Sequence, residues 1–330
     1  MTEQQLTRRE TLMGIGSAAV AGGIAVITGR GQAAVPTGWH MAETDTTQTL
    51  HDVQDTLTNP FAVGGNGRVL ERTSDGLWTT KIEDGPSGNG NDLFAADATD
   101  DGRRLWFSGA SGALGEYDVK TGTLIDHDPL GGDGTDDNSG PNDQTGNFDG
   151  LAVTGNADEA HVYITDQSGH VLYSHDNGET WNDTTPGSGS TIPAIDFRDD
   201  RKGHLCDTNG SVFATEDGEN WSKIGIEDAS VNYYGIESDG SDDVTVVGGN
   251  GKIREYNGSS WDEEDLGDKA FNGVYTTDVG TGAAVAEDGV VFEDPGTWTY
   301  AETPTDENLK NVTYGDVTAA VGASGTIIEK

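Results

Sequence analysis

The sequence contains a single cysteine, Cys206, in 330 residues. No intramolecular disulfide and no cysteine-based metal site can therefore form. Basic residues are also few, because 18 Lys and Arg stand against 58 Asp and Glu and leave a formal net charge of −40. Negative charge of this size repels nucleic acid and anionic membrane surfaces, so we expect neither as a partner.

The acidic residues are interleaved with Trp, Tyr, Val and Ile in short alternating runs and do not form one block. This pattern indicates folded strands and argues against a disordered acidic chain. The balance, rich in Asp and poor in Lys, is similar to that of proteins from extreme halophiles. There a dense carboxylate surface stays hydrated at high salt, so we interpret the charge first as an adaptation to the solvent.

Long hydrophobic runs are scarce as well. The only candidate, residues 12–28, is rich in Gly and Ala and shorter than the ~20 strongly apolar residues of a spanning helix. It follows Arg8 and Arg9, and the segment as a whole resembles a twin-arginine export signal. We expect a signal peptide at residues 1–34 and a mature protein that is extracellular or at the cell surface. A retained anchor is the alternative, and the rest of the chain contains no other membrane segment.

A short glycine turn recurs along the chain. Each copy has two small or polar residues, then Asn, Ser or Asp, then Gly, one variable residue and an aliphatic residue. Such turns between apolar runs indicate β-hairpins, because Gly and Asn accept a positive φ at low cost. Successive copies lie about 36 to 57 residues apart, close to the period of a propeller blade. The seven copies are centred on Gly67, Gly112, Gly169, Gly210, Gly251, Gly289 and Gly325.

The two ends of the chain carry nearly the same phrase, TGWHMAETDTTQTLHDV from residue 37 and GTWTYAETPTDENLKNV from residue 296. We take each turn copy with its four strands as one repeat unit. The second phrase then reads as the outer strand of unit six followed by the inner strand of unit seven. The first must therefore contain an outer strand that precedes unit one, and unit seven lacks its own fourth strand. The sequence predicts an all-β, seven-bladed β-propeller at residues 35–330, whose last blade is closed by the N-terminal strand.

One hairpin matches a known motif. Residues 174–181 read SHDNGETW, the full Asp-box pattern, and residues 214–221 read ATEDGENW, a degenerate copy. The chain therefore resembles Asp-box (bacterial neuraminidase repeat, BNR) propellers, and it is similar to photosystem II assembly-factor-like and WD/YVTN-like repeat propellers. The resemblance implies a structural hairpin brace, since the carboxylate accepts amide bonds and the Trp packs between strands. The residues concerned are Ser174, Asp176, Gly178, Trp181, Gly218 and Trp221.

Propellers usually bind at one mouth of the central channel, where loops lead into the inner strands. Aligning these strands gives a variable column of aromatic, amide and charged residues, which we predict to be the ligand or partner site. Ordinary strand-edge residues facing channel water would give the same column. Its members are His51, Phe94, Asp149, Tyr234, Asn272 and Lys310, with Pro193 at the matching position of unit four.

An Asp/Gly-rich insertion at about residues 126–147 interrupts the repeat. Asp136, Asn138 and Asn142 alternate there around a glycine, and hard oxygen donors of this kind suit Ca²⁺. A calcium-stabilised loop and a solvated acidic insertion are both consistent with the pattern. We expect no other cofactor.

Two functions fit these features. The first is an exported, monomeric, non-catalytic module that binds or assembles an envelope protein or a surface glycan. The second is an extracellular carbohydrate-active enzyme, which needs two acidic groups near each other at the channel mouth. A typical sialidase is disfavoured, because it needs three Arg for the substrate carboxylate and the few Arg here lack the expected context. No catalytic residue is assigned.

Overall fold

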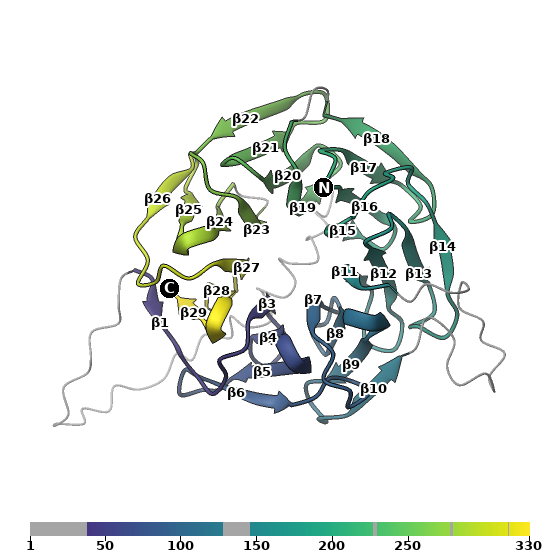
Figure 1. The fold of residues 1–330 in the computed structure, drawn as a ribbon. Coiled ribbons are helices and arrows are strands. Elements are labelled where there is room, and N and C mark those ends of the chain that lie inside the picture. The colour runs from purple at the N-terminus through teal and green to yellow at the C-terminus, as the bar shows by residue number, and fades with distance from the viewer. Residues whose placement is uncertain (1–37, 128–145, 227–229, 278–279, 316) are drawn as a thin grey trace, which may run out of the picture.

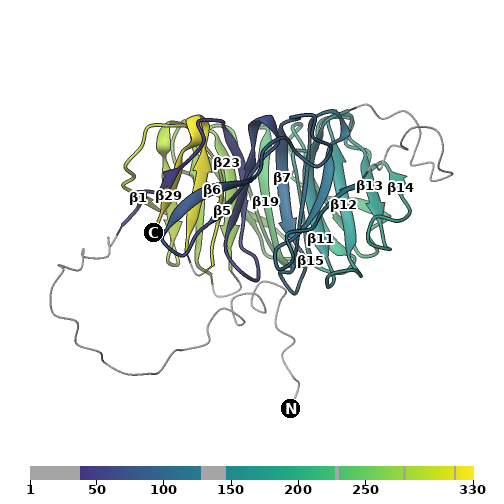
Figure 2. The same cartoon turned by 90° about the horizontal axis from the view of Figure 1, so that it is seen from below.

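A computed structural model describes residues 38–127, 146–226, 230–277, 280–315 and 317–330. Seven sheets, antiparallel except for one added strand, stand in a ring around a central channel, as Figure 1 shows along the axis and Figure 2 from the side. The predicted seven-bladed β-propeller is confirmed. None of the described residues belongs to a helix long and apolar enough to cross a membrane.

Each blade contains four strands that run in order from the channel to the rim, and strand β2 adds a fifth to blade 1. Blade 1 contains β3 (Leu50–Gln54), β4 (Phe61–Gly64), β5 (Arg68–Arg72), β6 (Leu77–Ile82) and β2 (Glu43–Thr44). Blade 2 contains β7 (Leu93–Ala98), β8 (Arg104–Gly109), β9 (Leu114–Asp118) and β10 (Leu124–His127). Blade 3 contains β11 (Phe148–Thr154), β12 (His161–Asp166), β13 (Val171–Ser174) and β14 (Asn182–Thr184).

Blades 4 to 7 follow the same plan. Blade 4 contains β15 (Ala194–Asp199), β16 (Lys202–Cys206), β17 (Val212–Thr215) and β18 (Trp221–Gly225), and blade 5 contains β19 (Tyr233–Gly240), β20 (Asp243–Gly248), β21 (Lys252–Tyr256) and β22 (Trp261–Asp265). Blade 6 contains β23 (Phe271–Thr276), β24 (Gly282–Ala286), β25 (Val291–Asp294) and β26 (Thr299–Ala301). Blade 7 contains β27 (Leu309–Thr313), β28 (Ala319–Gly322), β29 (Ile327–Glu329) and β1 (His40–Met41).

The chain closes the ring as the repeated end phrases predict. Strand β1 pairs antiparallel with β29, with His40 opposite Glu329, and so becomes the outer strand of blade 7. The next strand, β2, then pairs parallel with β6 of blade 1. The N-terminal segment therefore binds two neighbouring blades. The sequence did not predict the second of these pairings.

The glycine turns fall into two types, where the sequence interpretation had one. In blades 1, 2, 5, 6 and 7 the residue before the glycine has a positive φ, as in Asn66 at 59° and Ser111 at 55°. In blades 3 and 4 an Asp begins the turn instead, and Asp166 Oδ1 accepts two backbone N–H bonds at 2.8 and 2.9 Å. Asp207 makes the corresponding bonds in blade 4. In these two turns an Asp carboxylate bonded to backbone amides holds the turn, and the residue before the glycine does not need a positive φ.

The core lies between the blades. Phe61 and Val63 of blade 1, for example, pack with Leu93 and Phe107 of blade 2, and all four are buried. Burial of each such side chain contributes about 1.5–3 kcal/mol. Similar clusters join each blade to the next around the whole ring.

Glutamates in third strands add polar links between blades. Each accepts a bond from the indole N–H of a Trp at the outer strand of the following blade. The pairs are Trp298 with Glu255 at 2.9 Å, Trp39 with Glu293 at 2.9 Å and Trp78 with Glu329 at 2.6 Å.

The link between Trp78 and Glu329 joins blade 7 to blade 1, at the closing seam of the ring. Glu329 also accepts two bonds from Arg72, at 2.9 and 3.0 Å, and only 3% of the residue is exposed. Trp78, which binds the same carboxylate, is 1% exposed. A buried carboxylate of blade 7 therefore has all three of these donors in blade 1.

Blade 2 departs from the pattern, because its outer strand β10 has no Trp. At the other end of this strand, His127 lies opposite Leu114 and stacks on Trp106, with ring centroids 4.4 Å apart. Its Nε2 lies 3.1 Å from Glu116. Asp126 and His127, which the sequence interpretation grouped with the insertion, therefore belong to the blade.

Candidate functional site

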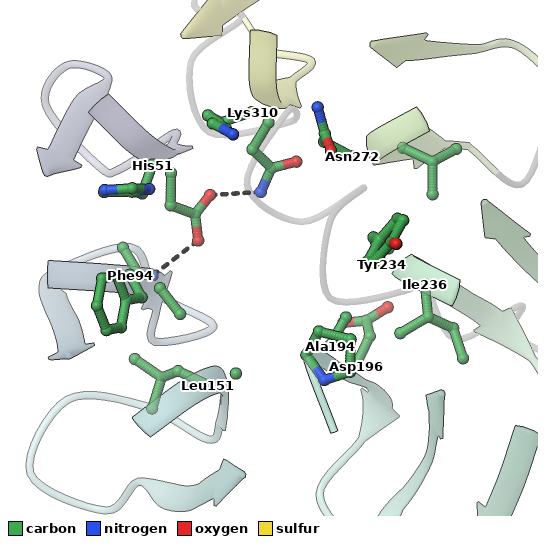
Figure 3. Close-up of a pocket in the computed structure, with 18 of the residues that line it drawn as sticks. His51, Phe94, Leu151, Ala194, Asp196, Tyr234, Ile236, Asn272 and Lys310 are labelled. Carbon is green, nitrogen blue, oxygen red and sulfur yellow. Dashed lines mark hydrogen bonds between the residues drawn. The ribbon is translucent and has the colours of Figure 1, made fainter. Parts of the chain in front are cut away.

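The seven inner strands enclose a cavity of about 160 Å³ on the propeller axis. All members of the variable column line it, so the structure brings the predicted site residues together from seven different blades (Figure 3). Each lies at or just before the start of its inner strand. They therefore share one mouth of the channel. We call this set, His51, Phe94, Asp149, Pro193, Tyr234, Asn272 and Lys310, the mouth ring.

The mouth ring coincides with a repeated irregularity of the sheets. In six blades the pairing of the first two strands shifts at the ring residue, as between Leu50 and Asp52 around His51. A β-bulge of this kind re-aims a side chain and is common beside functional sites. Blade 4 differs, because Pro193 precedes β15 and lies outside the ladder. The other bulges are at Phe94, Asp149, Tyr234, Asn272 and Lys310.

The side chains of the ring differ around the circle. His51 and Phe94 meet edge to face, with ring centroids 5.3 Å apart, and Lys310 lies on the next blade beside His51 (Figure 3). Burial lowers the pKa of His51, and the nearby charge of Lys310 lowers it further, while Asp92 opposes both effects. At neutral pH His51 is therefore uncharged, and Lys310 supplies the positive charge at this side of the mouth.

The other half of the ring is polar or aromatic. Asn272 donates to the carbonyl oxygen of Leu309 at 2.7 Å, which fixes its amide between blades 6 and 7. Asp149 accepts a bond from Gln167 at 3.2 Å, and burial raises its pKa. Tyr234 of blade 5 also lines the channel (Figure 3). The mouth therefore combines one cation, one carboxyl group and two aromatic faces.

The next position along each inner strand forms a column of mostly small residues. At Gly273 an added Cβ would lie 2.8 Å from the Cα of Asn311, so glycine is needed where the inner strands of blades 6 and 7 approach each other. Asp52 and Asn311 are the polar exceptions in this column. Asp52 accepts bonds from the amides of Val53 and Ala96, both at 2.7 Å, and from Asn311.

Burial raises the pKa of Asp52 to about 7, against the effect of these donors. Two other channel carboxylates bridge blades in the same way. Asp97 accepts from the amide of Val153 and Asp196 from that of Ser238, each at 2.7 Å. The sequence interpretation missed these residues, because an isolated Asp in so acidic a chain carries no signal. Their geometry assigns them to joining inner strands.

The proposed calcium ligands Asp136, Asn138 and Asn142 lie outside the described residues. In the part of the chain that the structure describes, no three His, Cys, Asp or Glu side chains are grouped to hold a metal ion. Cys206 is buried in blade 4, and burial raises the pKa of its thiol. It packs with Val212 and Tyr233.

The Asp-box residues brace a hairpin far from the mouth ring. Asp176 accepts bonds from the amide and hydroxyl of Thr180, at 2.9 and 2.6 Å, and Ser174 binds the amide of Gly178 at 2.8 Å. Burial raises the pKa of Asp176, but these donors outweigh it and the net shift is downward. Trp181 packs against the core of blades 2 and 3.

The degenerate copy works similarly. Asp217 accepts from the side chain and the amide of Asn220 at 2.8 and 2.7 Å, and these bonds lower its pKa to about 2. Gly218 has a φ of 75°, and Trp221 packs against the core of blades 3 and 4. Both copies thus hold turns between third and fourth strands.

A second pocket, which the sequence interpretation did not anticipate, opens at the opposite face between blades 2, 3 and 4. It has a volume of about 620 Å³ and an acidic lining that includes Asp100, Asp158 and Asp200. His161 and His175 face each other there, with ring centroids 5.0 Å apart. Burial, with the charges of Arg201 and His161, lowers the pKa of His175 to about 4, so this imidazole is neutral at pH 7.

No protein-family profile and no curated protein matches the sequence. Solved structures do match the fold. YCF48 bound to D1 peptide is 12% identical with a TM-score of 0.66, over 90% of this chain and 96% of that one. The RRP9 WD40 repeats are 12% identical, with a TM-score of 0.70, over 90% and 98%. Streptogramin B lyase is 12% identical, with a TM-score of 0.72, over 88% and 96%. At this identity the likeness supports the β-propeller fold alone.

Proposed function

We propose that this protein is an exported, non-catalytic binding or assembly module that holds a protein partner at the mouth ring. The observation that carries the proposal is the coincidence of the ring with β-bulges in six blades. Bulges turn dissimilar side chains toward one cavity, whereas a purely structural channel needs only small packed residues there. A surface glycan is the other ligand that the ring suits.

The solved structures support this proposal to a limited extent. One of them is YCF48 bound to D1 peptide, so a propeller of the same fold does bind a polypeptide segment. The Asp-box kinship, which rests on residues 174–181 and 214–221, belongs to the same proposal. It concerns ancestry and hairpin structure, and it makes no statement about the ligand.

The place of action is also part of the proposal. The twin-arginine pattern at Arg8 and Arg9 supports export, and the charge of −40 supports life in concentrated salt. Together they favour a partner in the cell envelope. We propose that the mature chain acts as a monomer, since a propeller of seven complete blades needs no second copy to bury its core.

The alternative function, a carbohydrate-active enzyme, has one observation in its favour. Asp149 and Asp52 both line the channel, and the pKa of each is raised by burial, as is common for catalytic acids. Both oxygens of Asp52, however, already accept bonds from backbone amides or Asn311. Asp52 is therefore better explained as a link between blades 1 and 2.

The test uses cross-linking in cells at growth salt. A photo-reactive phenylalanine analogue replaces Tyr234 in the full chain, and a second strain carries it at Asn209 in a turn of blade 4. We expect one protein to be captured reproducibly from position 234 and to be absent or much weaker from position 209. Equal capture from both positions, or none from either, contradicts the proposed partner site. Turnover of a polysaccharide by the purified protein, abolished by Asp149→Asn, would favour the enzyme.

A further inference from the structure

Lysine is rare in this protein, and most of the described lysines are neutralised. Five have a carboxylate within ion-pair distance, namely Lys81, Lys202, Lys252, Lys269 and Lys330. Lys223 binds the hydroxyl of Ser211. Lys120 is exposed to solvent at the turn between β9 and β10. Lys310 is the exception, because it is partly buried in the mouth ring and no described carboxylate pairs with it.

The position of Lys310 is therefore unusual in its electrostatics. A chain with 58 acidic residues offers many partners for a cation, yet Lys310 projects from a bulge toward the channel, beside a neutral His51. A partly buried ammonium group without a counter-ion loses hydration and gains no ion pair in return. An anionic ligand would supply the missing interaction.

The size of the cavity limits what this anion is part of. Its volume of about 160 Å³ is close to that of an engineered cavity of about 150 Å³ that holds benzene. The channel therefore accepts one side chain or one chain end, and it is too small for a folded domain. Phe94 and Tyr234 supply aromatic faces within the same cavity, and Asn272 supplies an amide.

We propose that the mouth ring binds the carboxylate of a single peptide residue, either a chain terminus or an Asp or Glu side chain, with Lys310 as its counter-ion. His51 and Asn272 border the same side of the mouth and supply neutral polar groups (Figure 3). Phe94 packs against His51 and offers its ring to the apolar part of the ligand. This inference rests on the proposed function and specifies the chemistry of the partner.

Asp149 contributes to selectivity. It lies in the ring on blade 3, away from Lys310 on blade 7, and it is held by Gln167. A second anionic group on the ligand would meet this carboxyl group and the Asp92 carboxylate near His51. The ring therefore favours a ligand with one carboxylate and disfavours a polyanion.

The experiment measures peptide capture by the purified exported protein at growth salt. The probes are two mixed libraries of N-acetylated hexapeptides that differ only at the C-terminus, which is a free carboxylate in one library and an amide in the other. Glucuronate is added as a competitor in a separate arm. Lys310→Met removes the counter-ion, Lys310→Arg keeps the charge, and Lys120→Met is the matched control. Thermal melting verifies that each variant is folded.

We expect the acid library to be enriched at least tenfold over the amide library if the ligand is a chain end. If the ligand is a side chain, the bound members of the amide library are enriched in Asp and Glu instead. Either enrichment falls at least tenfold in Lys310→Met and persists in Lys310→Arg and Lys120→Met. Failure of Lys310→Met to fold leaves the comparison of the two libraries as the test.

Two results would overturn the inference. Peptide binding that depends neither on the terminal carboxylate nor on Asp and Glu leaves the proposed partner site intact and removes the role of Lys310. Capture of no peptide from either library contradicts both the inference and the protein partner. The outcomes therefore separate the two proposals.

Discussion

The closing seam allows a prediction about Glu329. Replacing it with Ala removes the acceptor for Trp78 and for both Arg72 nitrogens, and it leaves a guanidinium group whose side chain is only 21% exposed. Breaking a buried pair by removing one partner costs about 3–5 kcal/mol. Because Arg72 retains some contact with water, we expect the lower half of that range. With an unfolding entropy of about 2.1 cal/mol/K per residue over roughly 290 residues, that corresponds to a fall of roughly 5–7 °C in melting temperature.

The matched control is Glu255→Ala. Glu255 accepts the same kind of Trp bond, from Trp298, and has no Arg in the interaction. Its loss should cost about 1.5–3 kcal/mol, the range for one hydrogen bond to a charged group. Differential scanning calorimetry at growth salt measures both variants. Equal falls in melting temperature would refute the reasoning about the stranded guanidinium. Adding Arg72→Met to Glu329→Ala should recover part of the loss, since no charge is then left unpaired.

Three further predictions concern the whole ring. Deleting residues 37–45 should lower the melting temperature more than Glu329→Ala does, because the deletion removes β1, β2 and Trp39 together. A chain that starts at residue 37 is the control. An unchanged melting curve would contradict the closure of the ring by the N-terminal strand. Asp52 has a folded pKa of about 7 and an unfolded pKa of about 4, so the folded state binds the extra proton between these values. The free energy of unfolding of the natural protein relative to Asp52→Asn should therefore fall by up to about 1.4 kcal/mol per pH unit from pH 4 to pH 7 and stay level above pH 7; a constant difference in chemical denaturation across this range would show that Asp52 does not titrate as described. Melting temperature should also rise steeply from low to molar salt, because salt screens the repulsion within a net charge of −40; a flat response would mean that the acidic surface has another origin.

The blade count and the closure were predictable because both depend on local patterns. Turns with Asn, Ser or Asp before Gly recur once per blade, and the shared phrase around Trp39 and Trp298 marks equivalent strands at the two ends of the chain. The mouth ring was predictable for the same reason, since aligned inner strands place equivalent residues at one end of the channel.

The bulges and the carboxylate links were not predictable in this way. A bulge at His51 is visible only in the register of β3 against β4, and the role of Asp97 depends on the amide of Val153 in the next blade. Neither relation leaves a periodic mark in the sequence. The Trp–Glu links do leave one, because Glu255, Glu293 and Glu329 occupy equivalent positions in third strands. The sequence therefore contains the pattern of these three glutamates, although our interpretation of it did not include them.

The pairing of His40 with Glu329 has a consequence for how the polypeptide is ordered. In the other six blades the third and fourth strands are neighbours in the chain and are joined by a turn, whereas in blade 7 backbone hydrogen bonds and packing hold the same antiparallel pair together without a connecting turn. A short linker from Lys330 to Gly38 would turn β29 and β1 into an ordinary hairpin, and the backbone could then be opened between any two blades. The chain break would then lie at another blade, while the packing between blades continues around the whole ring.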